Sequence, residues 1–123
     1  MSRFDHRYAD EMLRFRRAFA RGDQAELSEA ITDDFVWYTS AGEVIRGVDG
    51  VAAEIERRGR EWSDVRFEGM VERASDGFVT QTFHISGLDR GEPFAHAAVD
   101  LYQVAPDGRI ASKDTYWKRP ARD

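Results

Sequence analysis

The sequence predicts an α+β fold in which helices pack on one face of a strongly curved, mostly antiparallel sheet. In the first half of the chain, apolar residues recur at helical spacing, whereas from Trp62 onward they alternate with polar residues at every second position. Short turns containing Gly, Asp or Pro separate the alternating segments. Helices that come first and strands that follow are typical of a domain whose helices cover one side of its sheet.

Residues 5–21 predict an amphipathic first helix. Asp5 is a suitable N-cap, and Gly22 is placed to end the helix in the left-handed conformation. The apolar side chains at helical spacing form one stripe, which consists of Tyr8, Met12, Phe15 and Phe19. We therefore expect this helix to lay one face on the sheet.

Two further helices are expected. The second is short: it begins after Asp23, where Glu26 completes a pattern like a capping box, and it ends at Asp33-Asp34. The third begins at Asp49, its expected N-cap, and runs to about Gly59.

The expected strands follow the two-residue alternation. The last two form a hairpin over residues 96–118 around the turn Ala105-Pro106-Asp107-Gly108. Before them, we expect Val65, Phe67 and Val71 to point to one face and Arg66, Glu68 and Glu72 to the other. The remaining extended segments are residues 35–39, 44–46 and 78–86, with a polar loop over residues 87–92.

The composition is that of an ordinary globular protein. We expect the 123 residues, 1–123, to form a single domain with a substantial core. The absence of cysteine excludes disulfides and thiolate chemistry, and the net charge of −5 argues against nucleic acid as a partner. No apolar run is long enough to span a membrane, and the N-terminus lacks the apolar core of a signal peptide, so we expect a cytoplasmic protein.

A set of short motifs spread over nearly the whole chain points to a known family. The motifs are Ala20-Arg21-Gly22-Asp23, Thr32-Asp33-Asp34-Phe35, Arg46-Gly47, Asp107-Gly108-Arg109-Ile110 and Tyr116-Trp117. In this order, the chain resembles the NTF2-like superfamily, in particular its SnoaL-like and ketosteroid-isomerase-like proteins. The resemblance implies a cone in which a bent sheet wraps three N-terminal helices and a pocket opens at the wide end.

The resemblance to ketosteroid isomerases is incomplete at the positions that carry their chemistry. The position of their general-base Asp is Thr39 here, and that of their oxyanion-donating Tyr is Phe15. Their second oxyanion donor, an acid in an apolar-Asp-x-aromatic stretch, is matched by Asp100 in Val99-Asp100-Leu101-Tyr102. We therefore expect no steroid isomerisation by that mechanism.

Two other branches of the superfamily give further positions to test. The catalytic triad of limonene-epoxide-hydrolase-like members falls on Thr82, His84 and Thr115, which retain neither the Arg nor the acids. Polyketide-cyclase-like members use a pocket Asp and a nearby His, and Asp100 with His84 or His96 is similar to that arrangement. The resemblance thus favours acid/base chemistry on a small molecule.

Strand alternation places Asp100 on one face with His96, Ala98 and Tyr102. The family mapping makes this the pocket face and adds residues of the first and last strands. The expected set is Asp100 and His84 as catalytic residues, with Phe15, Trp37, Thr39, Thr82, His96, Ala98, Tyr102, Lys113, Thr115 and Trp117 as ligand-binding residues. An aromatic and apolar wall with a few polar groups is typical of a small-molecule site.

Each candidate also has a purely structural interpretation. In an apolar cavity, Asp100 can stay neutral and donate a hydrogen bond to a developing oxyanion, but it can instead form an ion pair with Lys113. His84 can act as a general base, or it can be a hydrogen-bonded core or rim residue. The three histidines show no paired spacing, so no metal site is expected.

Three functions remain open from the sequence. The first is a cofactor-independent isomerase, cyclase or lyase that acts on an apolar small molecule. The second is a domain that binds such a molecule without catalysis, and the third is a protein-interaction module. No phosphate-binding loop or nucleotide motif is present, so no cofactor is expected. A homodimer through the convex sheet face is also expected, with Leu101, Ile110 and Tyr116 at the interface.

Overall fold

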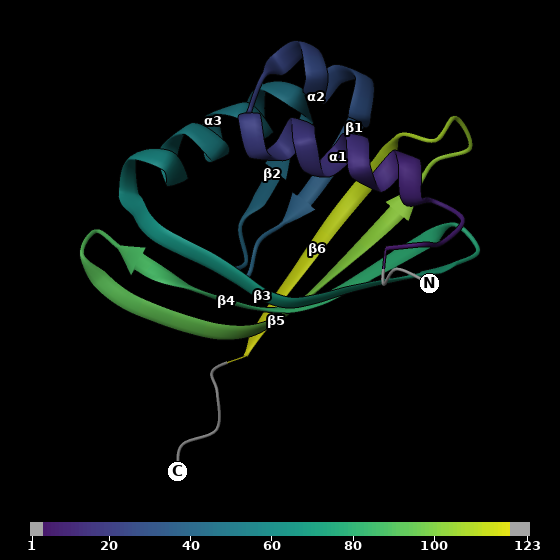
Figure 1. The fold of residues 1–123 in the computed structure, drawn as a ribbon. Helices are drawn as coiled ribbons and strands as arrows, with labels where there is room; N and C mark the ends of the chain where they lie inside the picture. The colour runs from purple at the N-terminus through teal and green to yellow at the C-terminus, as the bar shows by residue number, and fades with distance from the viewer. Residues whose placement is uncertain (1–3, 119–123) are drawn as a thin grey trace.

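A computed structural model of the chain describes residues 4–118 (Figure 1). Three helices precede most of the sheet, which has six strands. The elements are α1 (Ala9–Arg21), α2 (Gln24–Ala30), β1 (Ile31–Tyr38), β2 (Val44–Arg46), α3 (Gly47–Glu61), β3 (Trp62–Ser75), β4 (Phe78–Asp89), β5 (Glu92–Val104) and β6 (Ile110–Lys118).

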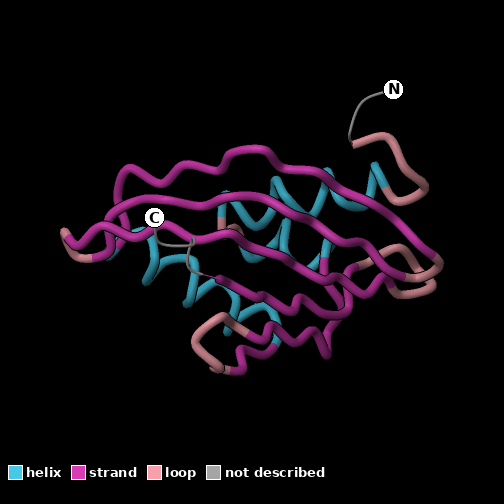
Figure 2. Tube along the Cα trace, turned by 90° about the horizontal axis from the view of Figure 1, so that it is seen from below, coloured by secondary structure: helices cyan, strands magenta, loops and turns pink. Residues whose placement is uncertain are grey.

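The six strands form one mixed sheet in the order β2-β1-β6-β5-β4-β3. All neighbouring pairs are antiparallel except β1 and β6, which run parallel. The sheet curves around the helices, which all lie on its concave side, as the two views show together (Figures 1 and 2). The α+β cone expected from the sequence is therefore confirmed.

Two irregularities bend the long strand β3. Its register with β4 shifts between Ser63 and Arg66 and again between Glu68 and Val71. A β-bulge bends a strand and increases its twist, so these shifts help β3 to wrap around the helices. Each extra residue also reverses which side chains face inward. As a result Glu72 is buried on the concave side and Val71 lies on the convex side, so the expectation that Val71 shares a face with Phe67 is wrong.

The main core lies between the helices and the concave face of the sheet. Helix α1 contributes Met12, Phe15 and Ala18, which are nearly fully buried. Of the expected apolar stripe, Met12 and Phe15 are in the core, while Tyr8, just before the helix, and Phe19 pack against it partly buried. The other members of this cluster are Leu27, Ala30, Ile31, Phe35, Trp37, Val51, Val79, Tyr102, Val104 and Ile110. Burial of these side chains holds the three helices against the sheet.

The helix ends agree with the prediction at some positions and differ at others. Gly22 ends α1 with φ +68°, and the Asp23 side chain caps α2 by accepting from the Ala25 N–H, both as expected. The expected start at Asp5 is wrong, because α1 begins at Ala9. Just before the helix, the Tyr8 N–H donates to Nδ1 of His6, and the Ala9 N–H donates to the backbone carbonyl of His6. These two hydrogen bonds form a turn instead of a helical start.

Strand β1 begins earlier than predicted. Ile31 is completely buried and pairs with Ile110 of β6, so the chain is already extended there. Asp33 and Asp34 lie within this strand and do not end α2. Both acids are exposed where the register with β6 shifts between Ile31 and Val36, and such an irregularity accommodates two consecutive polar residues.

Helix α3 is longer than expected at both ends. It begins at Gly47 with Arg46 as N-cap, so Asp49 lies in its first turn and is not the cap. A carboxylate in the first turn still interacts favourably with the helix dipole. The helix continues beyond Gly59 to Glu61, where β3 follows directly.

The convex face of the sheet is uncovered by any helix among the described residues (Figure 2). Leu101 and Tyr116 are exposed on it, as expected. Ile110, the third residue expected there, is instead completely buried in the core. None of the helices between residues 4 and 118 is long and apolar enough to cross a membrane.

The end of α1 gives a test of the packing between α1 and α3. Gly22 has φ +68°, and a Cβ built on it would lie 2.9 Å from Cγ2 of Ile55. Gly42 has φ +85° but has no atom within 4 Å of such a Cβ. We predict that Gly42→Ala lowers the free energy of unfolding by about 1–2 kcal/mol through backbone strain. Gly22→Ala lowers it by about 1 kcal/mol more, because Ile55 must also move.

Chemical denaturation of the two variants, compared with the unchanged protein, measures this difference. Equal destabilisation by the two substitutions would mean that Ile55 does not restrict the turn after α1.

Candidate functional site

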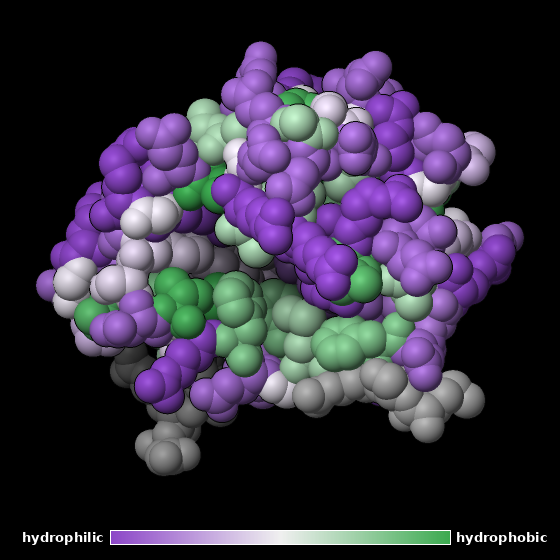
Figure 3. All heavy atoms as spheres, turned by 45° about the horizontal axis from the view of Figure 1, so that its top comes forward, coloured by the Kyte–Doolittle hydropathy of each residue, from purple (hydrophilic) through white to green (hydrophobic). Residues whose placement is uncertain are grey.

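A pocket of about 300 Å³ lies between α1 and the concave face of the sheet. This volume is at the lower end of the range for small-molecule sites. In the space-filling view, apolar side chains form a band along the sheet below the charged helices, with a hollow between them (Figure 3). The pocket is lined by Phe15, Arg16, Phe19, Ala20, Phe67, Met70, Gln81, Phe83, Asp100, Tyr102 and Lys113.

Helix α1 supplies one aromatic wall of the pocket. Phe15 and Phe19 are four residues apart, so they lie on the same face of the helix, with ring centroids 5.2 Å apart. Phe15 contacts the Tyr102 ring at 5.1 Å edge to face, and Phe19 contacts the Trp37 ring at 5.0 Å in the same way. These contacts tie the helix to strands β5 and β1 on the two sides of the pocket.

Strand register aligns the polar groups of the pocket. Asp100 of β5 pairs with Gln81 of β4 and with Thr115 of β6, and Tyr102 pairs with Lys113. Directly paired residues project to the same face of a sheet, so these side chains all point toward the helices. The hairpin predicted over residues 96–118 therefore has the expected phase.

Asp100 is buried, with 3% of its surface exposed. Its Oδ2 lies 3.1 Å from the Tyr102 hydroxyl and 3.7 Å from Nζ of Lys113. Its Oδ1 is also buried but has no hydrogen-bond partner within residues 4–118. A buried carboxylate oxygen without a partner is costly to folding, so it marks a position where a ligand can donate a hydrogen bond.

Lys113 is surrounded by aromatic rings. Its Nζ lies 4.1 Å from the ring centroid of Phe19, 4.8 Å from that of Trp37 and 5.8 Å from that of Tyr102. Burial lowers the pKa of Lys113, the Asp100 carboxylate opposes this effect, and the Arg58 charge adds to it. The net result is an amine that loses its proton more easily than an ordinary lysine.

A second buried carboxylate, Glu72 of β3, organises the other end of the polar cluster. It pairs with Arg16 of α1, and its Oε1 lies 2.9 Å from Nε2 of His6. Since Nδ1 of His6 accepts from the Tyr8 N–H, Nε2 carries the hydrogen and donates to Glu72. Glu72 also accepts from Nε2 of Gln81 at 2.6 Å.

This contact sets the orientation of the next two side chains. Because Nε2 of Gln81 donates to Glu72, its Oε1 faces the Tyr102 hydroxyl at 3.0 Å. A hydroxyl has one hydrogen, so Tyr102 donates either to Gln81 or to Asp100 at any moment. Burial and the nearby Asp100 charge raise the pKa of Tyr102 well above its usual value, so the group stays neutral.

Beside the pocket lies an aromatic cluster formed by Trp62, Phe94, His96 and Trp117. The His96 ring stacks on Trp117 at 4.7 Å, and the Trp117 ring lies parallel to Phe94 at 6.1 Å. Trp62 contacts both Phe94 and Trp117. Phe83, Ile85 and Ala98 form the buried base of this cluster.

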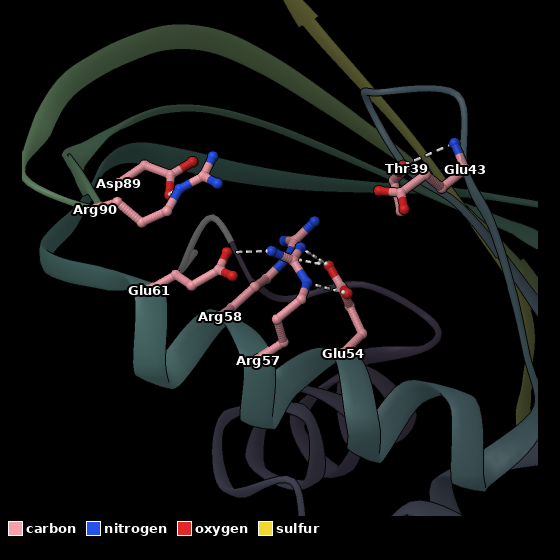
Figure 4. A network of polar contacts seen from close by, with 8 residues as sticks. All are labelled: Thr39, Glu43, Glu54, Arg57, Arg58, Glu61, Asp89 and Arg90. Carbon is pink, nitrogen blue, oxygen red and sulfur yellow. Dashed lines mark hydrogen bonds and ion pairs between the residues drawn. The ribbon is translucent and has the colours of Figure 1, made fainter.

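Arg58 of helix α3 lies between the pocket and the aromatic cluster. The Arg58 guanidinium lies 4.5 Å from the ring centroids of both Trp37 and Trp62. It donates to Glu54 one helical turn earlier, and Arg57 binds the same carboxylate (Figure 4). Burial alone would raise the pKa of Glu54, but the two arginines outweigh it and hold the pKa low.

Ten of the residues predicted for the site lie on the concave side. Of these, Phe15, Asp100, Tyr102 and Lys113 line the pocket itself. Trp37 donates through Nε1 to Oγ1 of Thr115 at 3.1 Å, and its ring contacts Nζ of Lys113. The hydrogen bond between Trp37 and Thr115 therefore fixes the ring against which the lysine packs. His96, Ala98 and Trp117 belong to the adjacent aromatic cluster. Thr39 caps the β1–β2 turn by accepting from the Glu43 N–H (Figure 4).

Two predicted residues are on the wrong face. His84 is exposed and pairs with Ala97, and Thr82 pairs with Val99, so both lie on the convex side of the sheet. The inward residues of β4 are Gln81, Phe83 and Ile85. The expectation that His84 acts in the pocket with Asp100 is therefore wrong.

Several pocket residues were not predicted. Phe19 was visible in the helical stripe, and the apolar alternation of Phe83 and Ile85 already indicated the inward phase of β4. Gln81 lies two residues before Phe83, so the same alternation placed it on the inward face, whereas Glu72 gave no such signal because the register shift between Glu68 and Val71 reverses the phase of β3. No cluster of His, Cys, Asp and Glu that could hold a metal ion is found within residues 4–118.

Comparison with solved structures shows which fold this is. An NTF2-like protein from Burkholderia xenovorans LB400 aligns with a TM-score of 0.81 and 18% identity over 90% of this chain and 88% of that one. A candidate polyketide cyclase from Xanthomonas campestris pv. campestris aligns with a TM-score of 0.73 and 19% identity over 91% of this chain and 90% of that one. A third structure is that of a hypothetical protein from Catenulispora acidiphila DSM 44928, which has a ketosteroid isomerase-like fold and was solved in complex with trimethylamine. It aligns with a TM-score of 0.72 and 16% identity over 88% of this chain and 85% of that one.

At these identities, the structural similarities show the NTF2-like fold alone. A comparison with functionally curated proteins gave no significant match. The sequence model of the SnoaL-like domain matches residues 12–113, which include every residue that lines the pocket. The chain therefore belongs to the SnoaL-like domain family.

Proposed function

We propose that this protein binds a small, largely apolar molecule in the pocket between α1 and the sheet, and that Asp100 and Lys113 exchange a proton with it. The reaction is a cofactor-independent isomerisation, cyclisation or elimination. The ligand is apolar over most of its surface and carries a hydrogen-bond donor and an acceptor at one end.

The observation that supports this most strongly is the incomplete bonding of two buried charged groups. Oδ1 of Asp100 has no hydrogen-bond partner within residues 4–118, and Nζ of Lys113 is 3.7 Å from Asp100, which is too far for a hydrogen bond. Both groups line the pocket. A ligand that donates to Asp100 and accepts from Lys113 would satisfy both.

The electrostatics of the pair suit proton transfer. General acid/base catalysis is most efficient when the pKa of the catalytic group lies near the working pH. Burial moves the pKa of Lys113 downward in that direction. Asp100 lies 3.7 Å from Nζ of Lys113, so the two groups can act on the same ligand.

The relatives support a small-molecule role. One structural relative is described as a candidate polyketide cyclase, and another was solved in complex with trimethylamine. The rival interpretation as a protein-interaction module requires a filled cone, whereas a cavity of about 300 Å³ is present here. We therefore favour ligand binding over a purely structural use of the cone.

Binding of 2-naphthol tests the pocket. This probe has an apolar body and one hydroxyl donor, whereas naphthalene has the body alone. We predict that 2-naphthol binds more tightly than naphthalene, and that Asp100→Asn weakens 2-naphthol binding by about tenfold, since a hydrogen bond to a charged group contributes about 1.5–3 kcal/mol. Isothermal titration calorimetry measures both affinities.

The matched control is Asp34→Asn, which removes an exposed carboxylate on β1 away from the pocket and should leave binding unchanged. Naphthalene affinity should be the same in all three proteins. If 2-naphthol bound the Asp100→Asn variant as tightly as the unchanged protein, Asp100 would not be the polar anchor of the pocket.

We also propose that two copies associate through the convex sheet face. Tyr38, Phe78, Leu101 and Tyr116 are 40–55% exposed there, and aromatic residues with a polar tip are typical of interfaces. We predict that light scattering at micromolar concentration gives twice the chain mass of 14.1 kDa. A charge at Leu101 should shift the protein toward the monomer.

The chain offers a close control for this variant. Leu101 is 40% exposed on the convex face, and Leu13 is 39% exposed on α1, which lies on the other side of the sheet. Leu101→Lys should lower the average mass, while Leu13→Lys should not. A monomer mass for the unchanged protein would refute the proposed dimer.

A further inference from the structure

The chain uses lysine sparingly. Of its 18 basic residues, only Lys113 and Lys118 are lysines, and the rest are arginines. Lys118 is exposed at the end of β6, whereas Lys113 is buried against the pocket. An arginine keeps its proton under all ordinary conditions, but a buried lysine can become a neutral amine with a free electron pair. Lys113 is thus one of only two residues in the chain whose side chain carries a primary amine.

The surroundings of Lys113 suit such a role. Its side chain lines the pocket, and Nζ is positioned by contacts with the rings of Phe19, Trp37 and Tyr102. The closest carboxylate oxygen, Oδ2 of Asp100, is 3.7 Å away. The amine is therefore held in place mainly by ring contacts, and these leave its electron pair available to a molecule in the pocket.

The charged groups around Lys113 come from several elements. Asp100 of β5 favours the ammonium form, while burial and Arg58 of α3 favour the neutral amine. Arg16 of α1 lines the same pocket, but its charge is paired with Glu72 of β3. The neighbouring residues of β1 and β4, Trp37 and Gln81, are uncharged.

We propose that Lys113 is a nucleophile that forms an imine with an aldehyde or ketone held in the pocket. This inference rests on the proposed function, because both need a ligand in the same cavity. It adds a covalent step and names the substrate class as carbonyl compounds with an apolar body. An enamine or imine formed in this way activates the carbon next to the carbonyl for isomerisation, elimination or ring closure.

The step begins from the neutral amine of Lys113, which forms when the ammonium gives a proton to solvent. Nζ attacks the carbonyl carbon, and one of its hydrogens moves to the carbonyl oxygen to give a carbinolamine. The carbinolamine hydroxyl takes up a proton from solvent and leaves as water. The product is a protonated imine on Lys113, whose positive charge lies beside Asp100 as that of the ammonium did, so atoms and charge balance and no oxidant or reductant is needed.

Reductive trapping tests the proposal directly. Benzaldehyde, an apolar carbonyl compound small enough for the pocket, is incubated with the whole protein and sodium cyanoborohydride near neutral pH. The hydride converts an imine into a stable benzylamine, which peptide mapping by mass spectrometry locates. We expect Lys113 to be benzylated several-fold faster than Lys118, because the pocket holds the aldehyde beside the Lys113 amine and burial lowers the pKa of that amine.

Two variants and one competition experiment accompany the measurement. Lys113→Arg keeps the positive charge but removes the nucleophile, so the fast labelling should disappear, and Lys118→Arg should leave labelling at Lys113 unchanged. Excess 2-naphthol should slow labelling at Lys113 and not at Lys118. If Lys113→Arg does not fold, the comparison of the two lysines within the unchanged protein still decides the question.

Labelling of Lys113 no faster than Lys118 would overturn the imine proposal. If 2-naphthol still bound in an Asp100-dependent way, the pocket and its proton-transfer role would stand and only the covalent step would be wrong. If neither the label nor 2-naphthol reached the pocket, the proposed function itself would be wrong.

Discussion

The contact between Asp100 and Lys113 is the constraint around which the pocket is built. Two opposite charges are taken out of water and face each other at 3.7 Å, and such burial is stable only if other groups support it. The Tyr102 hydroxyl supports the carboxylate, and the rings of Phe19 and Trp37 support the ammonium. Because burial holds the pKa of Lys113 below its unfolded value, the lysine opposes folding at low pH, and this effect fades as pH rises to the unfolded pKa.

A chain of buried polar contacts joins this pair to the helix above it. Arg16 of α1 binds Glu72 of β3, and Glu72 orients Gln81, which faces the Tyr102 hydroxyl next to Asp100. The same network therefore holds α1 against the sheet and orders the polar end of the pocket. Since a partly satisfied buried network is strongly destabilising, changes at Glu72 should affect both stability and the site.

The fold class could be predicted because it depends on simple periodicity, whereas the location of the site depended on the family resemblance. Strand alternation placed Asp100 on one face with Tyr102, and the resemblance made that the pocket face and added Phe15 and Lys113. The error at His84 came from following a family position where the apolar alternation of Phe83 and Ile85 indicated the other face. Glu72 could not be placed in this way, because the irregularity between Glu68 and Val71 reverses the phase of β3 without a clear signal in the residues.

The most direct test of this account is the titration of Lys113 itself. The chain contains only two lysines, so lysine labelled with ¹³C and ¹⁵N gives few resonances, and loss of one set in Lys113→Arg assigns it. Chemical shifts of Cε and Nζ followed across pH report the protonation of the amine. The account predicts a midpoint for Lys113 clearly below the value of about 10.4 for free lysine side chains. A midpoint at or above that value would mean that Lys113 is a permanent structural cation, and that the pocket contains no amine for proton transfer or imine formation.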